Sequence, residues 1–176
     1  MLDKNYRITF AVEKFLLLQL KMTLRKIVLA LVALTMSITV GAQNTDKIYD
    51  EAKALYDAKD YKAALPKLRA AAEKGHKKAQ YRLGRCYDKG HGVAEDNKVA
   101  FEWYQKSAAQ GYAKGQYALG KCYMKGKGTT ADQEKAKLWL KKAVKNPKGG
   151  MKVKEKIKNE AKEGDKDAKN IQKLLK

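Results

Sequence analysis

The chain has 176 residues, of which 39 are lysine or arginine and 19 are aspartate or glutamate, so its formal net charge at pH 7 is +20. This length suits one domain, and a periodic stripe of Tyr, Leu and Ala excludes disorder in the middle of the chain. So positive a charge indicates a partner such as nucleic acid, a membrane surface or an acidic protein.

The amino terminus has the organisation of a secretory signal peptide. Residues 22–26 form a short basic start, residues 27–40 are uncharged and mostly apolar, and small residues precede Gln43. We therefore predict a signal peptide over 22–42 that is cleaved after Ala42. The mature protein is then exported, and it is periplasmic or secreted.

Residues 1–21 precede this signal and do not fit its organisation. We interpret them as an upstream extension, with translation starting at Met22. The alternative is that residues 1–42 remain as an uncleaved membrane anchor, although their apolar runs are short and interrupted. Cleavage removes six basic and two acidic residues, which leaves residues 43–176 with a formal charge of +16. Because an exported protein seldom meets nucleic acid, the expected partner is a protein or peptide, and an acidic one would complement the positive charge.

Residues 43–78 predict a helical hairpin. Asp46 can cap its first helix, because a short acceptor side chain suits that position. Lys59-Asp60-Tyr61 makes the turn, and Pro66 falls in about the first turn of the second helix, where a missing N–H costs little. The hairpin resembles a tetratricopeptide unit in this turn and in two small residues, Ala52 and Ala64.

A unit of 36 residues then occurs twice. Tyr81-Arg-Leu-Gly-Arg-Cys-Tyr-Asp-Lys-Gly-His-Gly-Val93 returns as Tyr117-Ala-Leu-Gly-Lys-Cys-Tyr-Met-Lys-Gly-Lys-Gly-Thr129. The match continues in four later pairs: Asp96 with Asp132, Ala100 with Ala136, Trp103 with Trp139, and Lys106 with Lys142. A fixed period of this length indicates stacked helical repeats.

Each position that matches between the two copies has an expected role in packing. Gly84 and its copy Gly120 stand in mid-helix, where Gly costs about 1 kcal/mol against Ala, so we expect a neighbouring helix to come close there. The Gly-x-Gly pairs end each first helix and turn the chain. An aspartate, Asp96 or Asp132, then caps each second helix. The inter-repeat core is expected to hold Trp103, Tyr104, Trp139 and Leu140, together with Tyr87 and Tyr123.

This spacing resembles the Sel-1-like repeat, a relative of the tetratricopeptide repeat, specifically over 79–146 and more loosely over 46–78. The resemblance implies an all-α, tetratricopeptide-like α-solenoid of antiparallel helical hairpins in a right-handed superhelix. Its repeats are placed at 79–114 and 115–147.

Residues 148–176 differ in composition. Residues 145–176 hold eleven lysines and five acidic residues, with a narrow apolar stripe at Ile171, Leu174 and Leu175. Glu163-Gly164 and Ala168 have the same spacing as Lys74-Gly75 and Ala79 at the end of the first hairpin. We interpret this segment as a basic half-repeat with a capping helix that closes the solenoid, and a frayed basic tail is the alternative.

The sequence shows no catalytic constellation. Cys86 and Cys122 occupy equivalent points of stacked helices about 10 Å apart, too far for a disulfide, which needs Cα atoms within about 7 Å. We expect both to be buried as small apolar residues. Neither histidine has a second ligand at metal spacing. Ser107 lacks the lysine of the Ser-x-x-Lys motif of serine β-lactamases, an activity claimed for some relatives. We therefore predict no enzyme, cofactor or metal.

The tetratricopeptide pattern implies a concave surface built from the first helices of the repeats. That surface would be a basic groove with aromatic rungs, suited to an acidic peptide or a peptide carboxyl terminus. Its expected residues are Tyr49, Lys53, Lys78, Tyr81, Arg82, Arg85, Lys89, Lys114, Tyr117, Lys121 and Lys125. The chain is thus predicted to be an exported, monomeric protein-interaction module. Three alternatives stay open: a merely solvated face, a surface protein that holds anionic polymer or membrane, and a cell-wall-active enzyme.

Overall fold

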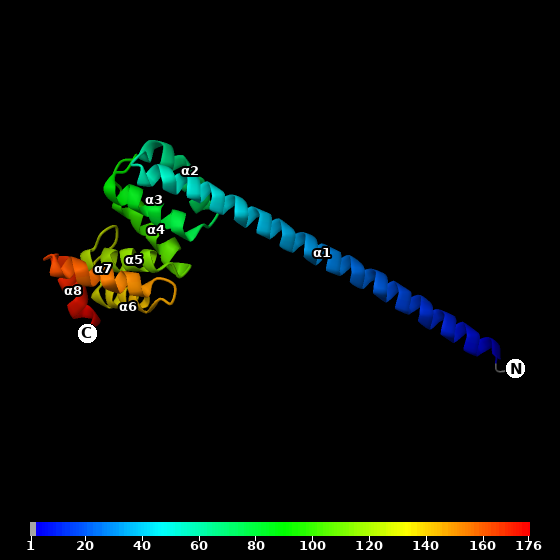
Figure 1. Cartoon of the computed structure of the whole chain (residues 1–176). Helices are drawn as coiled ribbons and strands as arrows, with labels where there is room; N and C mark the ends of the chain where they lie inside the picture. The colour runs from blue at the N-terminus through cyan, green and yellow to red at the C-terminus, as the bar shows by residue number, and fades with distance from the viewer. Residues whose placement is uncertain (1–2) are drawn as a thin grey trace. The chain divides into compact units, whose positions relative to one another are not determined.

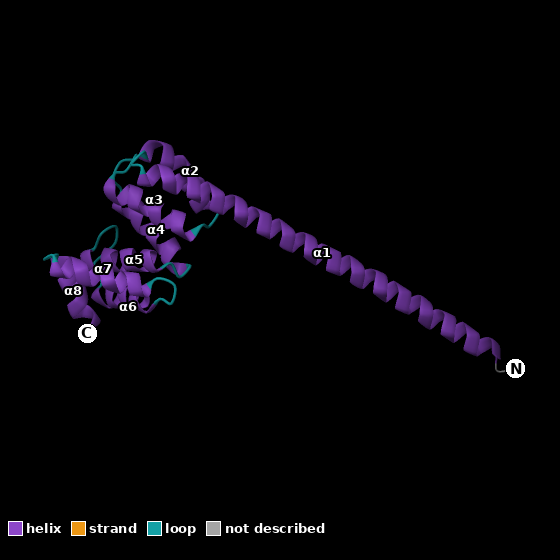
Figure 2. Cartoon of the chain, in the orientation of Figure 1, coloured by secondary structure: helices purple, strands orange, loops and turns teal. Residues whose placement is uncertain are grey.

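The computed structural model describes the backbone of residues 3–176 and the side chains of residues 16–17, 19–32 and 44–176. The chain order of its helices is α1 (Asp3–Asp57), α2 (Tyr61–Glu73), α3 (Lys77–Lys89), α4 (Asn97–Ala109), α5 (Ala113–Lys125), α6 (Gln133–Lys145), α7 (Gly150–Lys162) and α8 (Lys166–Leu175) (Figure 1). Across residues 3–176 there is no strand (Figure 2). The predicted all-α solenoid is confirmed.

The chain divides into two compact units, Met1–Asn44 and Thr45–Lys176. The first unit consists of the amino-terminal part of α1. Within the part of the chain that the structure describes, no helix has both the length and the apolar character required to cross a membrane. The predicted cleavage site after Ala42 lies outside the residues whose side chains are described, so the signal peptide stays a prediction.

The hairpin at the start of the second unit is formed by the end of α1 and by α2. The prediction that Asp46 caps a helix is wrong, because α1 runs through this position and the Asp46 carboxylate lies 3.2 Å from Nε2 of His76. Asp60 caps α2, accepting from the backbone N–H of Ala63 at 3.1 Å. Pro66 is placed beyond the first turn of α2, further into the helix than expected.

The helices α3, α4, α5 and α6 have 13 residues each. As predicted, α3 and α5 end on left-handed glycines, Gly90 at φ 67° and Gly126 at φ 70°. Asp96 caps α4 by accepting from two backbone N–H groups, and Asp132 caps α6 by accepting from that of Lys135 at 2.9 Å. The local signals in the two copies therefore produce the same pair of helices twice.

The mid-helix glycines mark close contacts, as expected. A Cβ at Gly84 would lie 2.7 Å from the ring of Tyr104, and one at Gly120 would lie 2.7 Å from Cγ of Leu140. Tyr104 and Leu140 are buried, as predicted. The two tryptophans are only partly buried, since each lies at the edge of a core cluster under a lysine side chain.

The carboxyl-terminal segment forms two helices, α7 and α8, where the sequence predicted one capping helix. Gly164 at φ 95° ends the turn after α7, as Gly75 at φ 87° does after α2, so the predicted correspondence is present. Asp165 caps α8 by accepting from the backbone N–H of Ala168 at 2.7 Å. Ile171 is fully buried against α6 and α7 residues, which makes this hairpin part of the core.

Candidate functional site

A pocket of about 270 Å³ lies between α3 and α5, the first helices of the two repeats. Tyr104 of α4 and Lys156 of α7 also line it, so side chains of four helices and one loop contribute. Its charged lining consists of six basic residues and one acidic residue: Arg85, Lys89, Lys121, Lys125, Lys127, Lys156 and Asp88. The pocket is therefore a basic cavity with tyrosine walls.

The structure brings six of the predicted concave-face residues together around this pocket: Tyr81, Arg85, Lys89, Tyr117, Lys121 and Lys125. Tyr81 is half-buried, with its ring 5.6 Å from that of Tyr112. Tyr117 is buried rather than an open rung, with 7% of its surface exposed. The two repeats thus contribute the same three positions, although to different depths.

The residues predicted from the first hairpin lie elsewhere and already have partners. Tyr49 is buried, stacks on His76 with ring centroids 4.2 Å apart, and accepts from Nε of Arg82 at 3.2 Å. Arg82 also pairs with Asp57 at 3.0 Å, as Lys53 does at 2.9 Å. Tyr49 and Lys53 do not line the pocket, so their predicted role in binding stays a prediction.

Two further predicted lysines, Lys78 and Lys114, are exposed and do not line the pocket. Lys78 lies over the ring of Tyr49, with Nζ 5.9 Å from its centroid. Partial burial lowers the pKa of Lys114, and nearby cations, first Arg82 and then Lys156, lower it further. Lys114 therefore has cationic neighbours at the amino-terminal end of α5.

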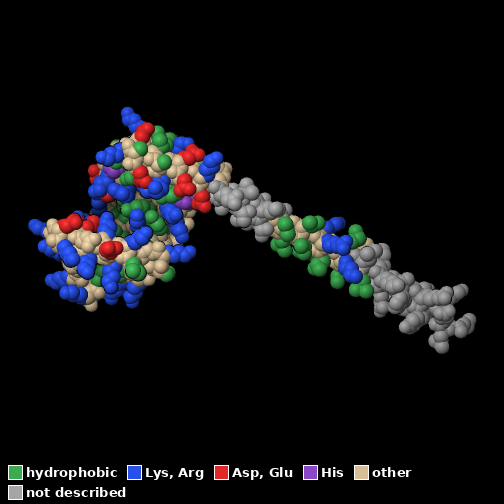
Figure 3. All heavy atoms as spheres, viewed as in Figure 1, with side chains coloured by type: hydrophobic (Ala, Val, Ile, Leu, Met, Phe, Trp, Pro, Cys, Tyr) green, Lys and Arg blue, Asp and Glu red, His purple; other side chains and the backbone are tan. Residues whose placement is uncertain are grey.

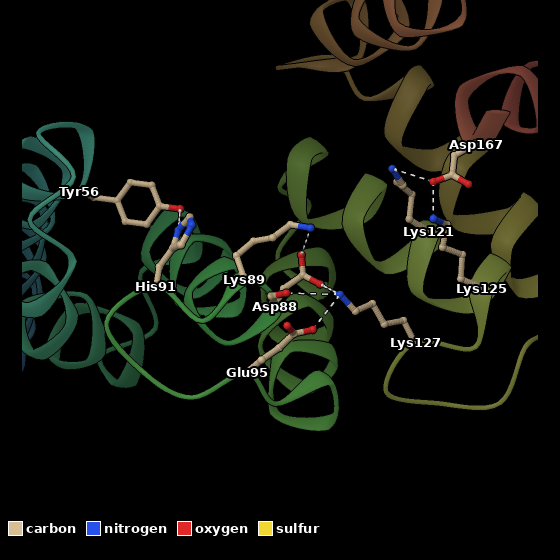
Figure 4. Close-up of polar contacts among 9 residues, drawn as sticks. All are labelled: Tyr56, Asp88, Lys89, His91, Glu95, Lys121, Lys125, Lys127 and Asp167. Atoms are coloured by element: carbon tan, nitrogen blue, oxygen red, sulfur yellow. Dashed lines mark hydrogen bonds and ion pairs between the residues drawn. The ribbon is translucent and has the colours of Figure 1, made fainter. Parts of the chain in front are cut away.

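Asp88 and Lys127 connect the two repeats, and sequence reasoning missed both. The Lys127 ammonium pairs with the Asp88 carboxylate, donates to the Asp88 carbonyl at 3.3 Å, and lies 3.6 Å from the Glu95 carboxylate (Figure 4). A signal was present, because these are positions where the two copies differ: Asp88 aligns with Met124, and Lys127 with His91. Non-matching positions could have been examined as candidate contacts between repeats.

His91 joins the first repeat to the first hairpin. Its Nδ1 lies 3.0 Å from the hydroxyl of Tyr56, a contact drawn as a dashed line in Figure 4, and its ring stacks on Tyr61 with centroids 4.1 Å apart. Desolvation lowers its pKa, and Arg85 and Lys89 lower it further. The histidine that the sequence placed in a turn therefore packs between aromatic rings.

In the second repeat, acidic residues of the carboxyl-terminal hairpin occupy the predicted binding positions. The Asp167 carboxylate of α8 pairs with Lys125 and lies 3.6 Å from the ammonium of Lys121 (Figure 4). The Tyr117 hydroxyl donates to Glu160 of α7 at 3.3 Å. Sequence analysis could not find these pairs, because they depend on the fold of α7 and α8.

In the first repeat, Arg85 has no carboxylate partner among the described side chains. It is half-buried beside the pocket, with its guanidinium 5.8 Å from the ring centroid of Tyr56. Burial by itself would lower the pKa of Arg85, but the neighbouring hydroxyls of Tyr81 and Tyr56 outweigh it and the pKa is raised. A partly desolvated guanidinium without an ion pair is a strong site for a carboxylate.

Both cysteines are free and buried, as expected of space-filling residues. Desolvation raises the pKa of the Cys86 thiol to about 11 and that of Cys122 to about 12. Because the thiolate is the reactive form, neither side chain is activated as a nucleophile. Among the described residues, no cluster of His, Cys, Asp and Glu could hold a metal ion.

Positive charge is concentrated in the carboxyl-terminal half of the second unit. Residues 45–112 carry 14 basic and ten acidic side chains, whereas residues 113–176 carry 19 basic and seven acidic ones. Figure 3 shows the same contrast, with lysine and arginine crowding the visible face over α5 to α8. The pocket lies at the border of this basic region, so its field favours anionic ligands.

Comparison with known proteins agrees with this architecture. The family model described as Sel1 repeat matches residues 77–112 and 113–147. Residues 77–147 therefore form two Sel1-like repeats. The matches begin at the first residues of α3 and α5, two residues before the predicted repeat boundaries. The Sel1 solenoid is typically a non-catalytic scaffold for protein interaction.

Two solved structures are similar to this chain. A Sel1 repeat protein from Oxalobacter formigenes is 38% identical, with coverage of 47% of this chain and 63% of that one and a TM-score of 0.47. A protective antigen of uropathogenic Escherichia coli that displays an SLR fold is 26% identical, with coverage of 74% of this chain and 28% of that one and a TM-score of 0.57. The chain thus spans less than two thirds of either protein. No curated protein matches it.

Proposed function

We propose that this protein is a non-enzymatic, exported interaction module that binds an acidic peptide segment in the pocket between α3 and α5. The observation that carries the proposal is Arg85, a half-buried cation with no carboxylate partner in the described part of the chain, beside a cavity of about 270 Å³. A peptide carboxylate would supply the missing charge. The tyrosine walls would supply contact area at low entropic cost.

Fluorescence anisotropy with the full chain tests this function. The probe is a labelled peptide of alternating glutamate and tyrosine, and the control peptide has glutamine in place of each glutamate. We expect the acidic peptide to bind and the glutamine peptide to bind at least about tenfold more weakly, since one charge-assisted hydrogen bond contributes about 1.5–3 kcal/mol. Equal binding of both peptides, or binding of neither, would contradict the proposal.

A pair of variants controls for general electrostatic attraction. Arg85→Glu changes the pocket, whereas Lys98→Glu makes the same charge change on an exposed side chain of α4. The proposed function predicts a large loss of affinity for Arg85→Glu and a small loss for Lys98→Glu. The small loss should disappear as salt screens the charge. Equal losses would place the binding outside the pocket.

Export is supported by the signal-like order of residues 22–42, and it has a separate test. Intact mass spectrometry of the protein purified from its native host measures the mature amino terminus. We expect a chain that begins at Gln43. A chain that retains Met1 would contradict export by a cleaved signal peptide.

A second candidate function, binding of an anionic polymer or membrane surface, is favoured by another cavity. This pocket of about 620 Å³ lies among α6, α7 and α8, with Val144, Ile157 and Leu175 in its lining. Five lysines also line it: Lys141, Lys145, Lys154, Lys158 and Lys176. Co-sedimentation with vesicles that contain phosphatidylglycerol distinguishes the two functions, because binding through scattered lysines should disappear in moderate salt. Failure to bind these vesicles in low salt would exclude this candidate.

A further inference from the structure

The second repeat shows what its concave positions bind. Tyr117, Lys121 and Lys125 follow one another at four-residue spacing along one face of α5. The Tyr117 hydroxyl binds the Glu160 carboxylate, and both lysines bind the Asp167 carboxylate. Glu160 lies near the end of α7, and Asp167 lies in the first turn of α8. Two carboxylates on either side of a helix–helix turn therefore cover this face of α5.

The first repeat carries the same chemistry 36 residues earlier, on α3. Tyr81 corresponds to Tyr117, Arg85 to Lys121, and Lys89 to Lys125. All three line the pocket of about 270 Å³. Within the described residues, the Tyr81 hydroxyl has no hydrogen bond and Arg85 has no ion pair. Lys89 has only the adjacent Asp88, at 3.8 Å, and the same Asp88 carboxylate is paired with Lys127.

We infer that Tyr81, Arg85 and Lys89 form a two-carboxylate site, which binds an acidic helix–turn–helix segment of a partner protein as α5 binds the turn between α7 and α8. One partner carboxylate would accept from the Tyr81 hydroxyl. The other would bind between Arg85 and Lys89, as Asp167 binds between Lys121 and Lys125. This inference rests on the proposed function and specifies its ligand: two acidic residues about seven positions apart across a turn.

The first-repeat site is better suited to an external ligand than its copy. Arginine replaces lysine at position 85, and its planar guanidinium can bind a carboxylate through two parallel hydrogen bonds. Asp88, the acidic side chain of the pocket, does not leave the site negative, because Lys127 neutralises it from the neighbouring loop. Among the described residues, no carboxylate pairs with Arg85, whereas Glu160 and Asp167 already bind the equivalent positions of α5, although all six positions line the same pocket.

A peptide of residues 157–170 of this chain is a suitable probe for the site. It contains both carboxylates, and its four lysines and four acidic residues cancel, so non-specific attraction to a basic protein is small. The control peptide carries Glu160→Gln and Asp167→Asn. Backbone amide shifts of the isotope-labelled full chain report where each peptide binds.

We expect saturable shifts over residues 77–89 with the acidic peptide, and binding about tenfold weaker with the control peptide. Tyr81→Phe and Arg85→Gln should each weaken binding of the acidic peptide, with the fold of each variant verified by its thermal unfolding. An Asp167→Asn full chain frees Lys121 and Lys125, so new shifts should appear over residues 113–125. Shifts that fall elsewhere, or that are equal for both peptides, would overturn the inference.

The outcomes separate this inference from the function on which it rests. If Arg85→Gln weakens binding of the glutamate–tyrosine peptide while the 157–170 peptide and its control peptide bind equally, the two-carboxylate site is wrong and the proposed pocket function stands. If neither acidic peptide binds, both proposals fail. A concentration-dependent dimer in sedimentation, lost in Arg85→Gln, would assign the site to a second copy of this chain and overturn the assignment to a different partner.

Discussion

Gly128 lies against the backbone of Asn97, so closely that a Cβ at position 128 would overlap the Asn97 carbonyl oxygen. One repeat earlier, a Cβ at Gly92 would stand 2.7 Å from the carbonyl oxygen of Tyr61. Asn97 and Tyr61 are the first residues of α4 and α2. Each Gly-x-Gly loop therefore packs against the start of the second helix of the preceding hairpin, and this contact joins successive repeats.

Gly128→Ala should destabilise the protein more than Gly111→Ala. Both glycines have positive φ, 74° and 71°, so both substitutions incur the same left-handed strain of about 1 kcal/mol. Nothing lies within 4 Å of a Cβ at Gly111, whereas Gly128 faces the Asn97 backbone. We expect a further loss of about 1–3 kcal/mol for Gly128→Ala, measured by urea unfolding. Equal losses would show that the loop does not hold the repeats together.

Stability should fall as the pH drops below about 6.5, because of His76. Its Nδ1 accepts from the backbone N–H of Ala79 at 3.1 Å and caps α3, which requires the neutral ring. Burial lowers the pKa of His76, and the positive charge of Lys78 lowers it further. The carboxylates of Asp46 and Asp50 raise it, but the pKa remains below its usual value. A group whose pKa is lower in the folded state stabilises the fold fully above its unfolded pKa of about 6.5.

The matched control for this prediction is His76→Asn, which retains a capping acceptor and does not titrate. Urea unfolding of both proteins between pH 8 and pH 5 measures the difference. We expect wild type to lose stability relative to His76→Asn as the pH falls through 6.5. A difference that is independent of pH would show that this ring does not contribute to the pH dependence.

The two thiols should be unreactive in the folded protein. Cys86 has 0% and Cys122 has 5% of its surface exposed, and desolvation raises their pKa values to about 11 and about 12. Ellman's reagent at pH 8 should therefore label neither within minutes in buffer and both in 6 M guanidinium. Rapid labelling of one thiol in buffer would mean that its core cluster opens locally.

Asp88 and Lys127 should be energetically coupled. Their side chains expose 17% and 31% of their surface, so their ion pair is partly desolvated and links α3 to the next loop. A double-mutant cycle with Asp88→Asn and Lys127→Met should give a coupling of about 1 kcal/mol. A coupling near zero in low salt would show that the pair does not hold the loop. Arg85→Gln is unsuitable for this cycle because it changes the proposed binding site.

Local sequence signals correctly predicted the structural features that depend on local interactions. The aspartate caps, the left-handed glycines and the mid-helix glycines each act within a few residues or at a fixed repeat offset, and Asp96, Gly90 and Gly84 were read correctly. The predicted cap at Asp46 is wrong because α1 continues through this position. The prediction of a single capping helix is wrong because α7 begins at Gly150 and the left-handed Gly164 separates it from α8.

The sequence by itself determined the repeat, its period and the tetratricopeptide-like stacking, because a 36-residue period requires equivalent packing surfaces at equivalent positions. It also placed Tyr81, Arg85 and Lys89 on a shared face. The tertiary structure decided which basic residues are open. Tyr49, Arg82, Lys121 and Lys125 each have polar partners from distant segments, whereas no carboxylate among the described side chains pairs with Arg85. Such pairs depend on where α7, α8 and the end of α1 dock, which helical periodicity does not encode.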